Sequence, residues 1–128
     1  MRKKILLVED NPQILKLLHL RLNRSYEVIF ASNGKEAVEI SALHLPDLIL
    51  LDITLSEVDG IQATRMIREN PRTSSIPILA TAASISLRDR EEIRTQGADD
   101  YIAKPFSYKQ LLPHIEGLLK KQAVAPSP

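Results

Sequence analysis

Apolar residues in this chain gather in short runs, and the segments between the runs have helical spacing. The runs ILLV and LILL are apolar at every position, whereas a strand with one face in water alternates apolar and polar residues. Strands of this kind are buried on both faces, as in a parallel sheet. The pattern predicts strands at 4–8, 26–31, 47–52, 76–82 and 100–105.

The intervening segments repeat their apolar residues every three or four positions, which is typical of helices packed on one side. The turn pair Asn33-Gly34 opens the second of them, Asp59 is a predicted N-cap for the third, and Gly97 is expected to end the fourth. Pro113 should disturb the last helix, because an interior proline costs about 3 kcal/mol. The helices are predicted at 12–23, 33–45, 61–70, 87–97 and 107–121.

Five strand–helix units in succession predict one doubly wound α/β domain, with helices on both faces of a parallel sheet. Crossovers between parallel strands are right-handed, and ligands bind such folds at the carboxyl ends of the strands. We expect the domain to span residues 1–121. Residues 122–128 lose the apolar periodicity and are expected to form a flexible tail.

Charged and polar residues follow the apolar runs at the ends that should meet. Glu9 and Asp10 follow the run ILLV, Asp52 follows LILL, Thr81 follows IPILA, and Lys104 follows YIA. Three adjacent carboxylates repel one another, so a cation is expected among them. An all-oxygen site with few protein ligands favours Mg²⁺ over Ca²⁺. With Lys104 and Thr81 facing a phosphate group, Asp52 is predicted to be a nucleophile that forms an acyl phosphate.

These residues, in this order, resemble the receiver domain of bacterial response regulators. The resemblance covers about residues 3–121 and includes further matching positions. The matching residues are Glu9-Asp10, Asp52, Asp59-Gly60, Thr81-Ala82, Tyr101 and Lys104-Pro105. The family implies a flavodoxin-like (β/α)5 fold with strand order 2-1-3-4-5.

The resemblance also implies a role for each site residue. Asp52 would accept a phosphoryl group from a phosphohistidine on a sensor histidine kinase or a histidine phosphotransfer protein. Mg²⁺, with Mn²⁺ as the alternative ion, would be held by Asp10, Asp52 and the backbone carbonyl of Thr54, with Glu9 assisting largely through water. Lys104 would pair with the phosphoryl oxygens, next to a commonly cis peptide before Pro105.

In the same family Thr81 moves toward the phosphoryl group, Tyr101 turns inward behind it, and the small Ala82 leaves space at the site. The fourth helix, fifth strand and fifth helix form the face that reports the phosphorylated state to a downstream target. The resemblance thus implies a two-state switch that assists its own phosphorylation and dephosphorylation and is otherwise not an enzyme.

Composition limits the possible partners. Lys and Arg number 17 against 16 Asp and Glu, so there is no basic excess for nucleic acid. There is no cysteine, and no apolar run approaches the roughly 20 residues of a membrane span. Glu9 and Asp10 end the first apolar run too early for a signal peptide. We therefore expect a cytoplasmic protein that contacts neither nucleic acid nor membrane and is a monomer when unphosphorylated.

Since only a short Pro/Ser tail follows the receiver region, we expect a stand-alone receiver that signals by protein binding or phosphorelay. An excised receiver of a hybrid kinase is an alternative. A second is a pseudo-receiver, a binding module that is never phosphorylated. A third is a haloacid-dehalogenase-like phosphatase, although that class needs an Asp two residues after the nucleophile, where this chain has Thr54.

The first helix has more apolar positions than one buried stripe requires. Ile14, Leu17 and Leu18 are assigned to the core. A flank of Leu15, His19 and Leu22 is the hypothesised docking surface for the phosphodonor, with a wide buried face as the alternative. The three histidines are interpreted as exposed helix residues rather than phosphohistidines: His19, His44 and His114.

Overall fold

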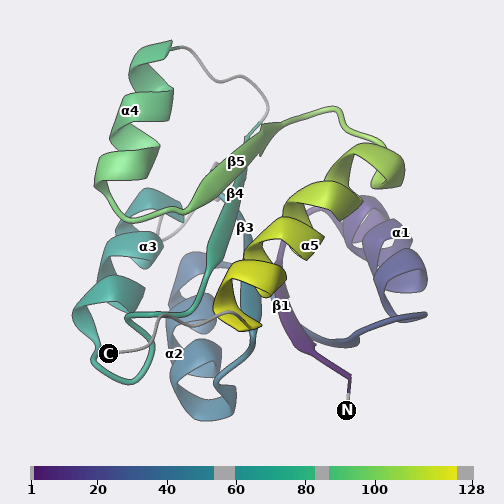
Figure 1. Ribbon diagram of the computed structural model, residues 1–128, viewed down its shortest axis with the longest axis horizontal. Coiled ribbons are helices and arrows are strands. Elements are labelled where there is room, and N and C mark those ends of the chain that lie inside the picture. The colour runs from purple at the N-terminus through teal and green to yellow at the C-terminus, as the bar shows by residue number, and fades with distance from the viewer. Residues whose placement is uncertain (1, 54–59, 83–86, 124–128) are drawn as a thin grey trace.

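A computed structural model describes residues 2–53, 60–82 and 87–123. Five parallel strands form a single sheet in the order β2-β1-β3-β4-β5, so the predicted fold and strand order are confirmed (Figure 1). The strands are β1 (Lys4–Val8), β2 (Glu27–Ala31), β3 (Leu48–Asp52), β4 (Ile78–Ala82) and β5 (Asp100–Ala103).

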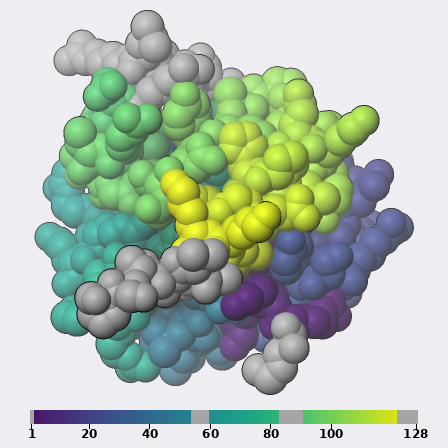
Figure 2. All heavy atoms as spheres, viewed as in Figure 1, coloured from purple at the N-terminus to yellow at the C-terminus, as the bar shows by residue number. Residues whose placement is uncertain are grey.

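Helices cover both faces of the sheet. They are α1 (Pro12–Leu22), α2 (Gly34–His44), α3 (Gly60–Glu69), α4 (Leu87–Thr95) and α5 (Tyr108–Ala123). One core cluster joins α2, α3 and α4 to one face of the sheet, and a second joins α1 and α5 to the other. Figure 1 shows these two layers, and α1 and α5 adjoin on the surface in Figure 2.

The central strands are apolar throughout because they contribute to both clusters. In β1, Leu6 and Val8 belong to one cluster, whereas Ile5 and Leu7 belong to the other. Every residue of β3 and β4 is buried. Alternate side chains point to opposite faces, so a strand covered on both sides has no position that favours a polar residue. Asp52 and Thr81, near the ends of β3 and β4, are buried polar residues and therefore exceptions to this pattern.

Helix boundaries agree with the sequence pattern to within one or two residues at most ends. Gly97 lies two residues after α4 with φ 117°, the left-handed conformation that favours glycine. Pro113 lies inside α5, which remains one element and continues to Ala123, two residues into the predicted tail. The predicted cap Asp59 and the tail residues 124–128 lie outside the described residues.

The buried stripe of α1 differs from the prediction. Leu18 is buried and Ile14 packs against the same cluster, but Leu17 is 59% exposed and was wrongly assigned to the core. Leu22 is fully buried, so its assignment to a docking surface was also wrong. The inward stripe follows positions 14, 18 and 22, one helical turn apart, which turns Leu17 toward solvent.

The histidines differ in their surroundings. His44 is exposed, as predicted. His19 is half-buried and packs edge-on against Phe30, with ring centroids 4.8 Å apart. His114 is half-buried, and its Nδ1 lies 2.7 Å from Asp100 Oδ2. The expectation of full exposure was therefore wrong for these two, because each packs against a neighbouring strand. Among the described helices, none is long and apolar enough to cross a membrane.

Candidate functional site

The predicted site residues meet at the carboxyl end of the sheet. Glu9 and Asp10 directly follow β1, and Asp52 is the last residue of β3. One ligand oxygen from each of these three carboxylates lies within 4.8 Å of the others. Because β1 and β3 are hydrogen-bonded neighbours, their ends place the acidic side chains side by side. The acidic cluster expected from the strand ends is present in the structure.

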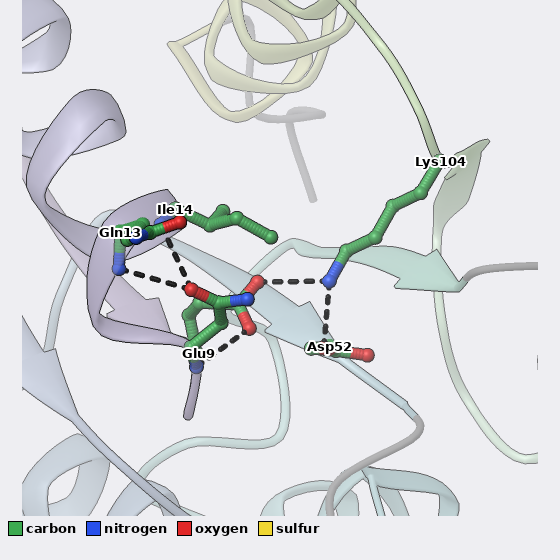
Figure 3. Close-up of polar contacts among 6 residues, drawn as sticks. Glu9, Gln13, Ile14, Asp52 and Lys104 are labelled. Carbon is green, nitrogen blue, oxygen red and sulfur yellow. Dashed lines mark hydrogen bonds and ion pairs between the residues drawn. The ribbon is translucent and has the colours of Figure 1, made fainter.

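A single ammonium bridges two of the carboxylates. Lys104 Nζ lies 2.8 Å from Asp52 Oδ2 and 2.9 Å from Glu9 Oε1, as Figure 3 shows. Lys104 follows β5, the strand at the sheet edge beyond β4, and its long side chain reaches back across the site. The ammonium links the two charges, whereas Asp10 stands at the exposed side of the cluster.

Two of the three carboxylates are buried, and among the described residues the cluster carries more negative than positive charge. Glu9 and Asp52 are each 3% exposed. Burial raises the pKa of Glu9, and the nearby Asp52 charge adds to this, although hydrogen bonds from Lys104 and the Asn11 amide act against it. Burial alone would lower the pKa of Lys104, but its bonds to Asp52 and Glu9 outweigh this effect and raise it. Three carboxylates around one ammonium make a site suited to a further cation.

Asn11 supports the cluster from the start of α1, a role that the sequence reasoning missed. Its backbone N–H donates to Glu9 Oε2 at 3.2 Å. Its side-chain Oδ1 accepts from the amides of Gln13 and Ile14, at 2.9 Å and 3.3 Å, and thereby caps the helix (Figure 3). An Asn directly before a Pro at a helix start is a cap signal and could have revealed the cap, although not the backbone bond to Glu9.

Other predicted site residues lie on β4, on β5 and directly after β5. Thr81 is the β4 partner of Asp52 and is 3% exposed, and its carbonyl accepts from Ile53 N at 2.9 Å. Ala82 is buried beside it, and the Lys104–Pro105 peptide is cis, as the family resemblance implied. Tyr101 is half-buried on β5. Thr54 lies outside the described residues.

An apolar cavity of about 200 Å³ adjoins the site between α1 and the segment after β5. Its apolar lining combines exposed Leu17 with half-buried Phe106, a residue that the sequence reasoning did not single out. Phe106 directly follows Lys104-Pro105, and an aromatic residue at that place was the available signal. The lining residues are Ile14, Leu17, Leu18, Lys104, Pro105 and Phe106.

Comparison with known proteins identifies the family. Residues 5–116 match the response regulator receiver domain model. The chain is 38% identical over 120 residues to the polar-differentiation response regulator DivK of Brucella anthropi, covering 93% of this chain and 98% of that protein.

Two solved structures are also similar. The receiver domain of sensor histidine kinase PA1611 from Pseudomonas aeruginosa has a magnesium ion coordinated in its active site cleft. It is 34% identical with a TM-score of 0.86, covering 94% of this chain and 99% of that one. A CheY-like receiver from Methanospirillum hungatei is 27% identical with a TM-score of 0.89, covering 96% and 98%. The chain therefore belongs to the response regulator receiver domains, the signalling domains of two-component systems.

Proposed function

We propose that this receiver accepts a phosphoryl group on Asp52 from a phosphohistidine in a Mg²⁺-dependent reaction. The observation that carries the proposal is the cluster of Glu9, Asp10 and Asp52 oxygens within 4.8 Å, with Lys104 bonded to two of the three residues. A buried excess of negative charge lowers stability unless it is used to bind a cation. Membership in the receiver family supports the same conclusion.

The donor set fits a hard divalent cation. It consists of carboxylate oxygens, it opens to solvent at Asp10, and no His or Cys lies among the clustered ligands of the described residues. Asp10 and Asp52 would hold the ion with the backbone carbonyl of Thr54, and Glu9 would assist through water. Mg²⁺ is the proposed ion and Mn²⁺ the alternative. When bound, the ion neutralises charge on the transferring phosphoryl oxygens.

In the proposed step an Asp52 carboxylate oxygen attacks phosphorus. The new P–O bond forms as the P–N bond to the donor imidazole breaks, and the nitrogen keeps the electron pair of that bond. Lys104 is already held at Asp52 and would shift its bonds to the phosphoryl oxygens. Thr81 lies beside Asp52 in the sheet and would donate its hydroxyl to the same group. Tyr101 would report this change on the face formed by α4, β5 and α5.

The proposed phosphodonor is a sensor histidine kinase or a histidine phosphotransfer protein, which would dock at the cavity beside Lys104. This revises the docking hypothesis: Leu17 and Phe106 replace the buried Leu22, and half-buried Leu15 and His19 lie on the same helix as Leu17. We further propose that residues 1–121 work in the cytoplasm as a monomer until phosphorylated. The signal would then pass to a downstream protein by binding or phosphorelay.

The decisive experiment is incubation with phosphoramidate and Mg²⁺, followed by intact-mass measurement. Wild type should gain one phosphoryl group, and this gain should disappear with EDTA or in Asp52→Asn. An adduct that persists in Asp52→Asn would place the acceptor elsewhere. No wild-type adduct would favour a non-phosphorylated pseudo-receiver. Continuous turnover of p-nitrophenyl phosphate would instead favour a phosphatase.

The docking surface has a matched control on the same helix, since Leu17 and Leu20 are both 59% exposed but only Leu17 lines the cavity. Transfer should be measured from a phosphorylated histidine phosphotransfer protein that serves the wild type. Leu17→Ala should slow the transfer, whereas Leu20→Ala should not. Equal rates in both variants would remove the cavity from the docking surface.

A further inference from the structure

The first residue of α3 lies against the backbone that carries Asp52. A Cβ added at Gly60 would lie 2.2 Å from Ile53 Cα and 2.7 Å from the Asp52 carbonyl oxygen. Both neighbours are main-chain atoms, so no side-chain rotation can relieve the contact. Gly60 N also donates to the Ile53 carbonyl at 3.3 Å. Glycine is therefore required here by the close approach of α3 to the end of β3.

Neither partner in this contact can move easily. On the helix side, Ala63, Thr64 and Ile67 are buried, and Thr64 Oγ1 donates to the Gly60 carbonyl at 2.7 Å. Packing of these residues against the sheet fixes the distance between α3 and the sheet.

On the sheet side, β3 lies between β1 and β4, and Ile53 N donates to the Thr81 carbonyl at 2.9 Å. Through Gly60, α3 contacts the end of β3, and the end of β3 is in turn hydrogen-bonded to the end of β4. The Asp52 side chain is therefore carried by a main chain that is fixed from two directions.

We propose that Gly60 is a positioning residue for Asp52. By allowing α3 to touch the Asp52–Ile53 main chain, it fixes the Asp52 carboxylate at the distance from Glu9 and Asp10 that one cation can span. The inference rests on the proposed function, since it concerns Mg²⁺ binding at that site. Sites of this kind tolerate errors of about 0.5 Å, less than the shift that an added Cβ would demand.

The chain offers two matched controls among its glycines. Gly97 is also crowded, because an added Cβ would lie 2.6 Å from Arg68 Cγ and its φ is 117°, but it lies at the turn after α4, away from the acidic cluster. Gly117 lies on α5 with open space around it. Gly97→Ala therefore introduces an added Cβ at a crowded position that is distant from Asp52. Gly117→Ala introduces the same glycine-to-alanine change at a position where the added Cβ meets no neighbour.

The experiment is calorimetric titration of each variant with Mg²⁺, without a phosphoryl donor, after cooperative thermal unfolding has verified the fold. Gly60→Ala should bind Mg²⁺ about 10-fold or more weakly than wild type, since changes to the residues that orient metal ligands typically cost about 10–100-fold in metal affinity. Gly97→Ala should lose stability yet keep the wild-type affinity for Mg²⁺, and Gly117→Ala should match the wild type in both stability and affinity. Wild-type affinity in folded Gly60→Ala would overturn the inference.

If Gly60→Ala does not fold, a second pair of variants tests whether the position of Gly60 affects Mg²⁺ binding. Thr64→Val keeps the side-chain shape but removes the hydroxyl bonded to the Gly60 carbonyl, and Thr64→Ser retains that hydroxyl. Thr64→Val should weaken Mg²⁺ binding several-fold, with Thr64→Ser closer to wild type. Equal binding by both would overturn the inference. If wild type binds no Mg²⁺, the proposed function itself fails, and the positioning role fails with it.

Discussion

Lys104 and Arg68 are basic side chains at opposite ends of the sheet, and both are bonded to aspartate. Arg68, on α3, donates through Nη2 to Asp99 Oδ2 at 2.6 Å, just before β5 begins. Its other donors reach the carbonyls of Gly97 at 2.9 Å, Ser74 at 3.1 Å and Ile76 at 2.6 Å. Lys104, after β5 ends, instead bridges the carboxylates of Glu9 and Asp52.

The two sites differ in the net charge that is left after the basic side chain has made its hydrogen bonds. The guanidinium of Arg68 is matched by one carboxylate and by carbonyls that need a donor, and Asp99 Oδ2 also accepts from Ile78 N at 2.8 Å. That network is balanced. At Lys104, within the part of the chain that the structure describes, one positive charge lies among three carboxylates. An ion pair that balances its surroundings supports the fold, whereas one that leaves excess charge indicates a ligand.

The largest expected effect is on stability, at the balanced network. Arg68→Met keeps the apolar stem but removes every donor, leaving the buried carbonyl of Ile76 without its charged partner. We expect the free energy of unfolding to fall by about 2–4 kcal/mol. Urea denaturation measures this value, and Mg²⁺ affinity should remain that of wild type. A loss of Mg²⁺ affinity comparable to that of Gly60→Ala would show that the two ends of the sheet are not independent.

The next effect belongs to the unbalanced cluster. Mg²⁺ should stabilise the wild type by mass action, by ~2.7 kcal/mol at a free concentration about 100 times its dissociation constant. Thermal unfolding at increasing Mg²⁺ measures the shift, with matched ionic strength as the control. Asp10→Asn should lose most of the response, because it removes the solvent-facing ligand. The same shift in Asp10→Asn would exclude Asp10 from the site.

The same substitution should have opposite effects in the two regions. Asp99→Asn removes a charge from a balanced network and should lower the free energy of unfolding by about 1 kcal/mol. Asp52→Asn removes one of three mutually repelling carboxylates and keeps an oxygen for Lys104. Without Mg²⁺, this variant should be at least as stable as wild type, because functional groups are often held at a cost in stability. Urea denaturation in EDTA compares both variants, and equal destabilisation would contradict the distinction.

The sequence was sufficient for those features that depend on chain order and periodicity. The continuous apolar runs at 5–8 and 48–51 predicted strands covered on both faces, and the residues after these runs predicted the site. The helix face of α1 was less predictable. Leucines at 15, 17, 18, 20 and 22 surround much of the helix, and hydrophobicity alone cannot show which of them meets α5.

Contacts made through the main chain were also hidden from the sequence. The bond from Asn11 N to Glu9, the carbonyls gathered by Arg68 and the approach of Gly60 to Asp52 leave little trace in the pattern of side chains. Each depends on how closely two elements pack. The topology alone predicts which polar side chains meet at the strand ends. The main-chain contacts that hold those side chains in position can be identified only from the three-dimensional structure.

The smallest expected effect concerns Glu36, a carboxylate that belongs to neither region. It is exposed in the first turn of α2, and its Oε1 accepts from Ser32 N and Ser32 Oγ, each at 2.8 Å. The Ser32 amide, followed by the hydroxyl, lowers the pKa of Glu36 below its ordinary value. Its contribution to stability should be fully present above the pKa of the unfolded chain and be lost as the pH falls through the lowered folded value.

Glu36→Gln should therefore melt slightly below wild type at neutral pH, and the difference should close in acid. Glu39→Gln, an exposed carboxylate on the same helix, is the control and should show a smaller difference. A Glu36 difference independent of pH would mean that the contact contributes through its hydrogen bonds rather than through its charge. Glu36 would then differ from Asp99 and Asp52. At those two residues, the loss of one charge is expected to decide whether the variant is less or more stable than the wild type.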